Sequence, residues 1–360
     1  MTQPVTALQY FEATWEFMPQ LRPDSLTERV TQVAREILRG YIVFWVLAQV
    51  LKPLVRLMVL PASWFDFTVE RTRFRAQQLH RPSLNFFRTV VTPDKAQLDV
   101  FVVKRGDNLP CILVCNPNGA SFTSYGTRPE MGPFSYGAQK HPMQRLVEEN
   151  KLPFNIVFFD YRCVSPKKWS KEALFWRERE LLVDVASVWQ FAKQSLNAPI
   201  VHTTGHSLGG MVSAITRDTL KQKQGIQHTD RSPASIDAFL RARLGDRLGA
   251  FGAYLASLAG FTLEAQAAFS RIGEEPVRGL RLATWHRLDG ITGDKAVCYG
   301  EEGAWSWELK NLRDDVLQGR VFHPELWAHQ EDILHFNTRN GVYSMKDLLT
   351  HFLMHQVPQS

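Results

Sequence analysis

A serine flanked by glycines is the clearest candidate for chemistry in this chain, within the segment Gly205-His206-Ser207-Leu208-Gly209. The segment follows the apolar run from Ile200 to Thr204 and precedes a helix-compatible stretch from Met211 to Leu220. A G-x-S-x-G sequence between strand and helix is typical of a sharp turn that exposes the serine hydroxyl for nucleophilic attack. The glycines leave room for the strand and the helix to approach closely, and the helix N-terminus favours an oxyanion forming beside the serine. An incidental glycine-rich turn is the alternative interpretation.

Two further segments, taken together with this one, resemble the α/β-hydrolase superfamily. The run from Cys111 to Asn116 and the following Pro117 to Ser121 resemble its third strand and oxyanion loop. In this chain Asn116-Pro117 stands where many members carry His-Gly. The segment from Asn155 to Ser165 resembles the fourth strand and its Asp-Tyr-Arg-Gly continuation, with Cys163 in place of the first glycine. The resemblance runs from about Leu98 to Phe352.

The resemblance also implies where an oxyanion would bind. The backbone N–H groups of Asn118 and Leu208 would be its two donors. Because Asn-Pro favours a turn in its own right, a purely structural role for this loop is the alternative.

The order of the catalytic residues in this superfamily is serine, acid, histidine. The resemblance therefore implies Asp289, just past the apolar run that ends at His286, as the acid, with Asp294 as the alternative. Asp289 could also merely begin a turn before Gly290.

The histidine is expected in the loop between a last strand at 320–322 and a final helix at 345–355. His329 is the expected base, because the sequence that follows it resembles the usual start of that loop. His335 and His323 are the alternatives.

Alternation of short apolar runs with helical stretches begins at about residue 85. Helices are predicted at Glu178 to Leu196, Gly210 to Gln222 and Ile236 to Arg271. Continuous apolar strands separated by helices indicate a mostly parallel central sheet with helices on both faces. Asp184, within the first of these helices, is expected to have a structural role.

Residues 1–80 are predicted to form an N-terminal apolar helical extension, and residues 81–360 the α/β-hydrolase domain. Ser25 to Glu28 has the spacing of a capping box, and the run from Tyr41 to Leu51 carries no charge. This run is shorter than the roughly 20 residues that a spanning helix needs. Two interpretations remain open: an interfacial helix at a membrane surface, with basic residues at its rim, or helices buried against the body of the protein.

Composition bounds the class of protein. Hydrophobic residues make up 44% and charged residues 22%, which is typical of a globular chain. The net charge of +6 suits anionic surfaces, but it could equally serve solubility alone, and no nucleic-acid signature accompanies it.

The four cysteines, two of which (Cys111 and Cys115) are expected in the core, show no CxxC spacing, so neither a zinc site nor a disulfide framework is expected. The start of the chain lacks a secretory pattern, so a cytoplasmic location is expected, with peripheral membrane association as the alternative.

These features predict a serine hydrolase that acts on carboxylic esters or thioesters, with lipid or acyl substrates favoured and no metal or cofactor required. Three alternatives stay open. The first is an inert α/β-hydrolase fold that serves as a binding or scaffold protein. The second is an acyltransferase or peptidase with the same triad, and the third is a membrane-anchored interaction protein.

Overall fold

The structure is a computed structural model of the whole chain, and part of it is described. The described residues are 33–35, 37–39, 46, 71–72, 74–75, 85–118, 121–124, 144, 147–148, 151–164, 177–222, 224–230, 232–272, 281–285, 305–308, 335–338 and 341–344. For residues 124 and 230 and from 281 onward, only the backbone is described. The predicted capping box, almost all of the apolar run after Tyr41 and the predicted final helix lie outside these residues.

The chain separates into two compact units, Met1–Val50 and Leu51–Ser360. The predicted domain boundary at residue 80 stays a prediction. Within the described segments, we find no helix with the length and apolar character needed to cross a bilayer.

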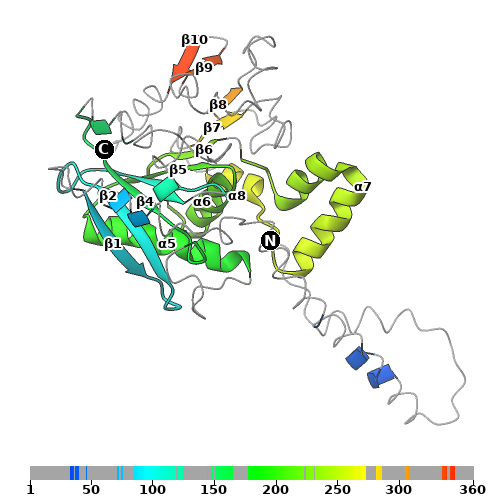
Figure 1. Cartoon of the computed structure of the whole chain (residues 1–360). Coiled ribbons are helices and arrows are strands. Elements are labelled where there is room, and N and C mark those ends of the chain that lie inside the picture. Colours follow the sequence, from blue (N-terminus) through cyan, green and yellow to red (C-terminus); the bar gives the residue numbers. More distant parts are fainter. Residues whose placement is uncertain are drawn as a thin grey trace, which may run out of the picture. The chain divides into compact units, whose positions relative to one another are not determined.

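An eight-stranded sheet forms the centre of the larger unit, in the order β1-β2-β4-β3-β5-β6-β7-β8 (Figure 1). Its strands are β1 (Phe86–Val91), β2 (Gln97–Val103), β3 (Cys111–Cys115), β4 (Asn155–Phe159), β5 (Val201–His206), β6 (Gln227–Asp230), β7 (Arg281–Trp285) and β8 (Trp305–Glu308). β2 runs antiparallel to both β1 and β4, and the remaining neighbours are parallel. The mostly parallel sheet predicted from the sequence is therefore confirmed.

The α-helices of this unit with described bounds are α5 (Glu178–Ser195), α6 (Leu208–Thr219), α7 (Ile236–Leu258) and α8 (Ala265–Ile272), and a 3-10 helix η2 spans Phe122–Ser124. The first two match their predicted ranges to within a few residues. The single helix predicted over 236–271 is wrong, because residues 259–264 separate α7 from α8 and Gly260 ends α7 with a φ of 85°. A pattern rich in Ala and Leu continues across this break, so periodicity alone did not reveal it.

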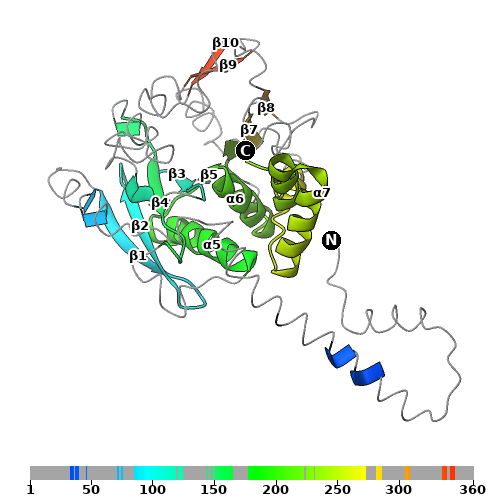
Figure 2. The ribbon, with the colours of Figure 1, turned by 45° about the vertical axis from the view of Figure 1, so that its right-hand side comes forward.

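Side chains alternate between the two faces of the sheet along each central strand, as the strand period of two requires. Val100 and Val102 belong to the core cluster that also contains Val185 of α5 and Val212 of α6. Phe101 and Val103 belong to the other cluster, with Phe74 and Val147. Both faces are therefore buried, as predicted, and Figure 2 shows α5 and α6 side by side against one of them.

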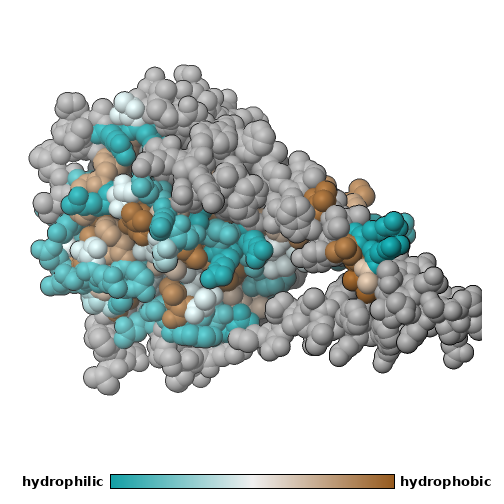
Figure 3. All heavy atoms as spheres, turned by 90° about the horizontal axis from the view of Figure 1, so that it is seen from below, coloured by the Kyte–Doolittle hydropathy of each residue, from teal (hydrophilic) through white to brown (hydrophobic). Residues whose placement is uncertain are grey.

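The cysteines Cys111 and Cys115 are fully buried in the first of these clusters, which confirms their prediction as core thiols. Outside the core, the described part of the surface in Figure 3 is mostly hydrophilic, with hydrophobic residues scattered among the polar ones.

Candidate active site

Ser207 occupies the one-residue junction between β5 and α6. Its φ of 53° and ψ of −122° lie outside the backbone regions that residues other than glycine normally adopt. Its carbonyl accepts the N–H groups of Gly210 and Met211, at 3.1 and 3.4 Å, and so starts the helix. The strand and the helix expected around the serine are both present, and Ser207 is half-buried.

The two glycines of the motif are required by close approach of backbone to backbone. A Cβ on Gly205 would lie 2.3 Å from the carbonyl carbon of Gly209, and one on Gly209 would lie 2.2 Å from the carbonyl oxygen of Cys115. No side chain fits at such distances. The serine is therefore held against the end of β3 by packing that only glycine permits.

A narrow cavity of about 30 Å³ opens beside Ser207. It is lined by Asn118, Ser207, Leu208, Met211, Pro233, Ile236 and Phe239. Three residues predicted from the sequence, Ser207, Leu208 and Asn118, thus meet at one place. The rest of the described lining is apolar.

Asp160, directly after β4, holds the loop that carries Asn118. Its Oδ2 accepts a hydrogen bond from Ser121 Oγ at 2.7 Å, and its Oδ1 accepts the N–H of Phe122 at 2.9 Å. Asn116, at the start of the loop, donates through Nδ2 to the Phe159 carbonyl at 2.7 Å and to Asp160 Oδ1 at 3.3 Å. Both ends of the Asn118 loop are therefore tied to the end of β4.

Arg71 completes this cluster with an ion pair of 2.8 Å to Asp160 Oδ2. Burial raises the pKa of Asp160, and the positive charge of Arg71 acts in the opposite direction. Sequence reasoning missed the role of Asp160, although an acidic residue directly after an apolar strand was a signal that could have been used.

Arg162 forms a second buried cluster, with Asp184. Its Nε donates to Asp184 Oδ1 and its backbone N–H to Asp184 Oδ2, both at 2.9 Å. Its Nη1 pairs with Asp94 Oδ2 at 2.5 Å. Burial raises the pKa of Asp184 to about 7, and the positive charge of Arg162 acts in the opposite direction. The cluster joins the segment after β4 to α5 and to the β1–β2 turn, an arrangement that matches the structural role expected for Asp184.

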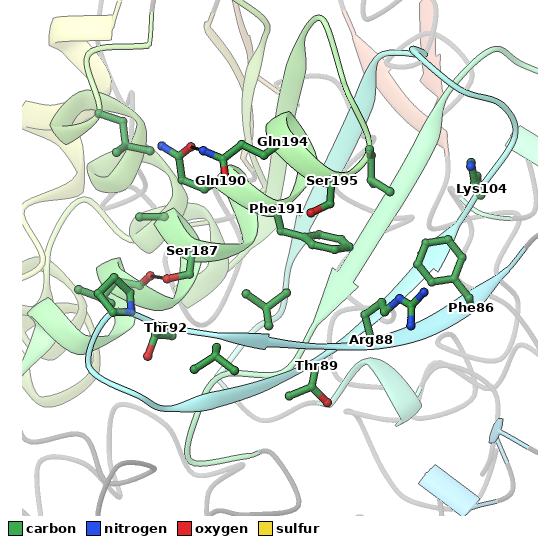
Figure 4. Close-up of a pocket in the computed structure, with 17 residues that line it drawn as sticks. Phe86, Arg88, Thr89, Thr92, Lys104, Ser187, Gln190, Phe191, Gln194 and Ser195 are labelled. Carbon is green, nitrogen blue, oxygen red and sulfur yellow. Dashed lines mark hydrogen bonds between the residues drawn. The ribbon is translucent and has the colours of Figure 1, made fainter.

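A wider groove, of about 970 Å³, lies between β1 and α5 (Figure 4). Its polar lining includes Arg88, Ser187, Gln190 and Gln194, and the Arg88 guanidinium lies 5.4 Å from the Phe86 ring centroid. None of its lining residues is a carboxylate, a histidine or a cysteine, and none was predicted as a site residue. Among the described residues no group of three or more His, Cys, Asp or Glu could hold a metal ion.

The predicted acid and base lie in the least described part of the chain. Asp289, Asp294, His323 and His329 are outside the described residues. His335 was predicted in a loop, but its backbone begins β9 (His335–Thr338), which pairs with β10 (Gly341–Ser344).

The strand predicted at 320–322 lies outside the described residues. The neighbour of β7 in the sheet is β8, at Trp305–Glu308, a strand that was not predicted. The sequence signal was present and missed, because Trp305 and Trp307 alternate with polar residues in the way that strands favour.

Searches against protein-family models and against curated proteins give no match. Among solved structures, an esterase of Pyrococcus furiosus is similar, with 14% identity, a TM-score of 0.41, and coverage of 59% of this chain and 73% of that one. A Xanthomonas campestris protein described as an α/β serine hydrolase without lid has 16% identity, a TM-score of 0.33 and coverage of 60% and 78%. Oligopeptidase B from Leishmania major has 11% identity, a TM-score of 0.38 and coverage of 58% and 29%.

The strand order, the antiparallel second strand and the serine at the turn between the fifth strand and its helix give the chain the α/β-hydrolase fold.

Proposed function

We propose that this chain is a serine hydrolase that cleaves carboxylic ester or thioester bonds of acyl or lipid substrates. The observation that carries the proposal is the backbone of Ser207, with a φ of 53° at the junction of strand and helix beside an apolar cavity. Such a conformation costs on the order of 1–3 kcal/mol and tends to occur where function depends on it.

The proposed reaction begins when a histidine base, with His329 as the first candidate, takes the proton of Ser207. Oγ attacks the carbonyl carbon, and the N–H groups of Leu208 and Asn118 donate to the oxyanion. The protonated histidine gives its proton to the leaving alcohol or thiol as the carbon–oxygen or carbon–sulfur bond breaks. Water, activated by the same histidine, then attacks the acyl-enzyme and releases the carboxylic acid. Asp289 would orient the imidazole.

The apolar side chains beside Ser207 support an acyl substrate, although the cavity itself, at about 30 Å³, has room only for the reacting group. Met211, Pro233, Ile236 and Phe239 present hydrocarbon next to the serine. Burying the methylene groups of an acyl chain against such surfaces stabilises the complex by roughly 0.8 kcal/mol per group.

Hydrolysis of p-nitrophenyl esters from acetyl to palmitoyl tests this proposal. Wild-type protein should hydrolyse them, with KM falling as the chain lengthens. Ser207→Ala should lose the activity, by a factor of about 10⁶ where the full triad operates. Ser187→Ala, on α5 in the separate groove, is the matched control and should retain it. Absence of activity from folded wild-type protein would favour the inert scaffold, and cleavage of peptides alone would favour a peptidase.

The base and the acid are assigned by the same assay. His329→Ala should lower kcat by several orders of magnitude, whereas His335→Ala and His323→Ala should not. Asp289→Asn should lower kcat by about 10⁴, and Asp294→Asn should leave it near the wild-type value. A loss confined to another of these variants would move the assignment to that residue.

A further inference from the structure

Helix α7 is a hairpin of two arms rather than a straight helix. Gly245, with a φ of 76° and a ψ of 166°, breaks the helix between residues 236–244 and 246–258. A Cβ on Gly249 would lie 2.5 Å from the Cα of Arg241, so the second arm packs directly on the backbone of the first. The two arms can be followed in Figures 1 and 2.

The hairpin carries large apolar side chains on its outside. Leu244 is 51% exposed, Leu248 66%, Phe251 60% and Tyr254 59%. Leu248, Phe251 and Tyr254 recur at a spacing of three residues on the second arm, and Leu244 ends the first arm, next to the turn. Single exposed apolar residues are ordinary on protein surfaces, but a cluster of this kind indicates an interaction surface.

Basic residues accompany this apolar surface at the turn. Arg243 and Arg247 are both exposed, next to Leu244 and Leu248 in the sequence, with the acidic Asp246 between them. Arg241, further from the turn, is already paired with Asp237 at 2.8 Å. Leucine and aromatic side chains with arginines at their edge are typical of helices that lie in the headgroup region of a bilayer. The chain as a whole carries a net charge of +6, which has the sign that anionic headgroups attract.

The same hairpin forms a wall of the cavity at Ser207. Ile236 and Phe239, in the first turns of α7, line this cavity. The rise of a helix places the Gly245 turn about 13 Å further along the first arm. A surface bound to the outside of the hairpin would therefore lie within the length of a fatty acyl chain from the serine.

From this arrangement we propose that the α7 hairpin docks on an anionic lipid surface through Leu244, Leu248, Phe251 and Tyr254, with Arg243 and Arg247 contacting the headgroups. The docked hairpin holds the Ser207 cavity beside the bilayer, so that acyl lipids in the bilayer are the substrate class. The choice of substrate rests on the hydrolase proposed above, whereas the docking itself does not.

Flotation of the full chain with vesicles tests the docking. Wild-type protein should bind vesicles of phosphatidylcholine weakly, and vesicles that also contain phosphatidylglycerol more tightly. The double variant Leu248→Ser/Phe251→Ser should weaken binding to both by about tenfold or more. Val91→Ser, which removes an apolar side chain 60% exposed on β1, is the matched control and should bind as wild type.

A second variant separates charge from apolar contact without altering the core. Arg243→Gln/Arg247→Gln should weaken binding to the phosphatidylglycerol vesicles by about tenfold, with binding to phosphatidylcholine unchanged. All of the variants carry surface changes, and an unchanged circular dichroism spectrum and urea unfolding curve would show that each is folded, whether or not Ser207 reacts.

Three results would overturn the docking proposal. The first is failure of wild-type protein to bind either vesicle. The second is binding of both α7 variants as tight as that of wild type, which would place any membrane contact elsewhere in the chain. The third is a dimer in light scattering that the Leu248→Ser/Phe251→Ser variant dissociates, with vesicle binding unaltered, in which case a second copy is the partner. If Ser207 proves inert while the α7 variants still lose vesicle binding, the hydrolase proposal fails and the docking surface stands.

Discussion

At the scale of single residues, Ser207 depends on neighbours that have no chemistry of their own. Its backbone conformation is unfavourable in isolation. Gly205 and Gly209 make it possible, because the backbone packs so closely against them that any Cβ would clash. The sequence predicted this close packing, because the G-x-S-x-G motif contains the two glycines that it requires.

Gly209→Ala should therefore destabilise the protein and distort the serine together. A Cβ there would meet the Cys115 carbonyl oxygen at 2.2 Å, and overpacking of this kind costs about 1–3 kcal/mol. Urea unfolding and the rate of fluorophosphonate labelling would measure the two effects. Gly252→Ala is the control, since its Cβ would have ordinary contacts at 3.4 Å and should stabilise the helix by up to about 1 kcal/mol. Equal behaviour of the two variants would refute the packing argument.

Asp160 is the residue whose role the sequence reasoning missed. Its carboxylate is tied to both ends of the loop that carries Asn118. It is a positioning residue in this account, because it acts through the placement of the Asn118 N–H.

Asp160→Asn should slow labelling of Ser207 by about 10- to 100-fold, approaching the cost of losing one oxyanion donor. In ester hydrolysis the loss should fall on kcat rather than KM. Asp184→Asn is the matched control, because it removes an equally buried carboxylate that does not contact this loop. If both variants lose labelling to the same extent, Asp160 has a general structural role only.

At the scale of elements, the buried pair of Arg162 and Asp184 links the end of β4 to α5. Burial raises the pKa of Asp184 to about 7, above the value of about 3.9 expected in the unfolded chain. Between about pH 4 and pH 7 the folded protein therefore keeps a proton on Asp184 that the unfolded chain has lost. The contribution of this proton to the free energy of unfolding is full below about pH 4 and is lost as the pH rises towards 7.

The unfolding free energy of wild-type protein, relative to Asp184→Asn, should therefore fall as the pH is raised from 5 to 8. The slope should not exceed about 1.4 kcal/mol per pH unit. Urea unfolding of both proteins across this range measures it. A difference that is constant or grows with pH would mean that Arg162 keeps the carboxylate ionised throughout.

The elements from residue 85 to 285 could be predicted because their apolar runs are long and separated by clear helical stretches. Periodicity failed at 259–264, where an apolar pattern continues through a turn. At Trp305–Glu308 the alternating pattern was present but short, and the pairing of this strand with β7 is a long-range property of the sheet. The hairpin form of α7 follows from one glycine with a positive φ, which composition alone does not reveal.

At the scale of the whole molecule, the sheet order brings the end of β3, the turn after β5 and the start of α7 to one place. The sequence could assign Ser207, Leu208 and Asn118 to that place, because each lies within three residues of the end of an apolar strand and matches a position of the family it resembles. The sequence does not identify the acid and the base as specifically as it identifies the serine. Their segments follow short strands, and several histidines compete for one position.

The central claim, that Ser207 is a nucleophile, is tested most directly by labelling with a fluorophosphonate probe. Intact mass and peptide mapping would locate the adduct in wild-type protein and in Ser207→Ala. The account predicts one adduct per chain, on Ser207, and none in the variant. A folded wild-type protein that takes up no probe, or an adduct on another residue, would contradict it.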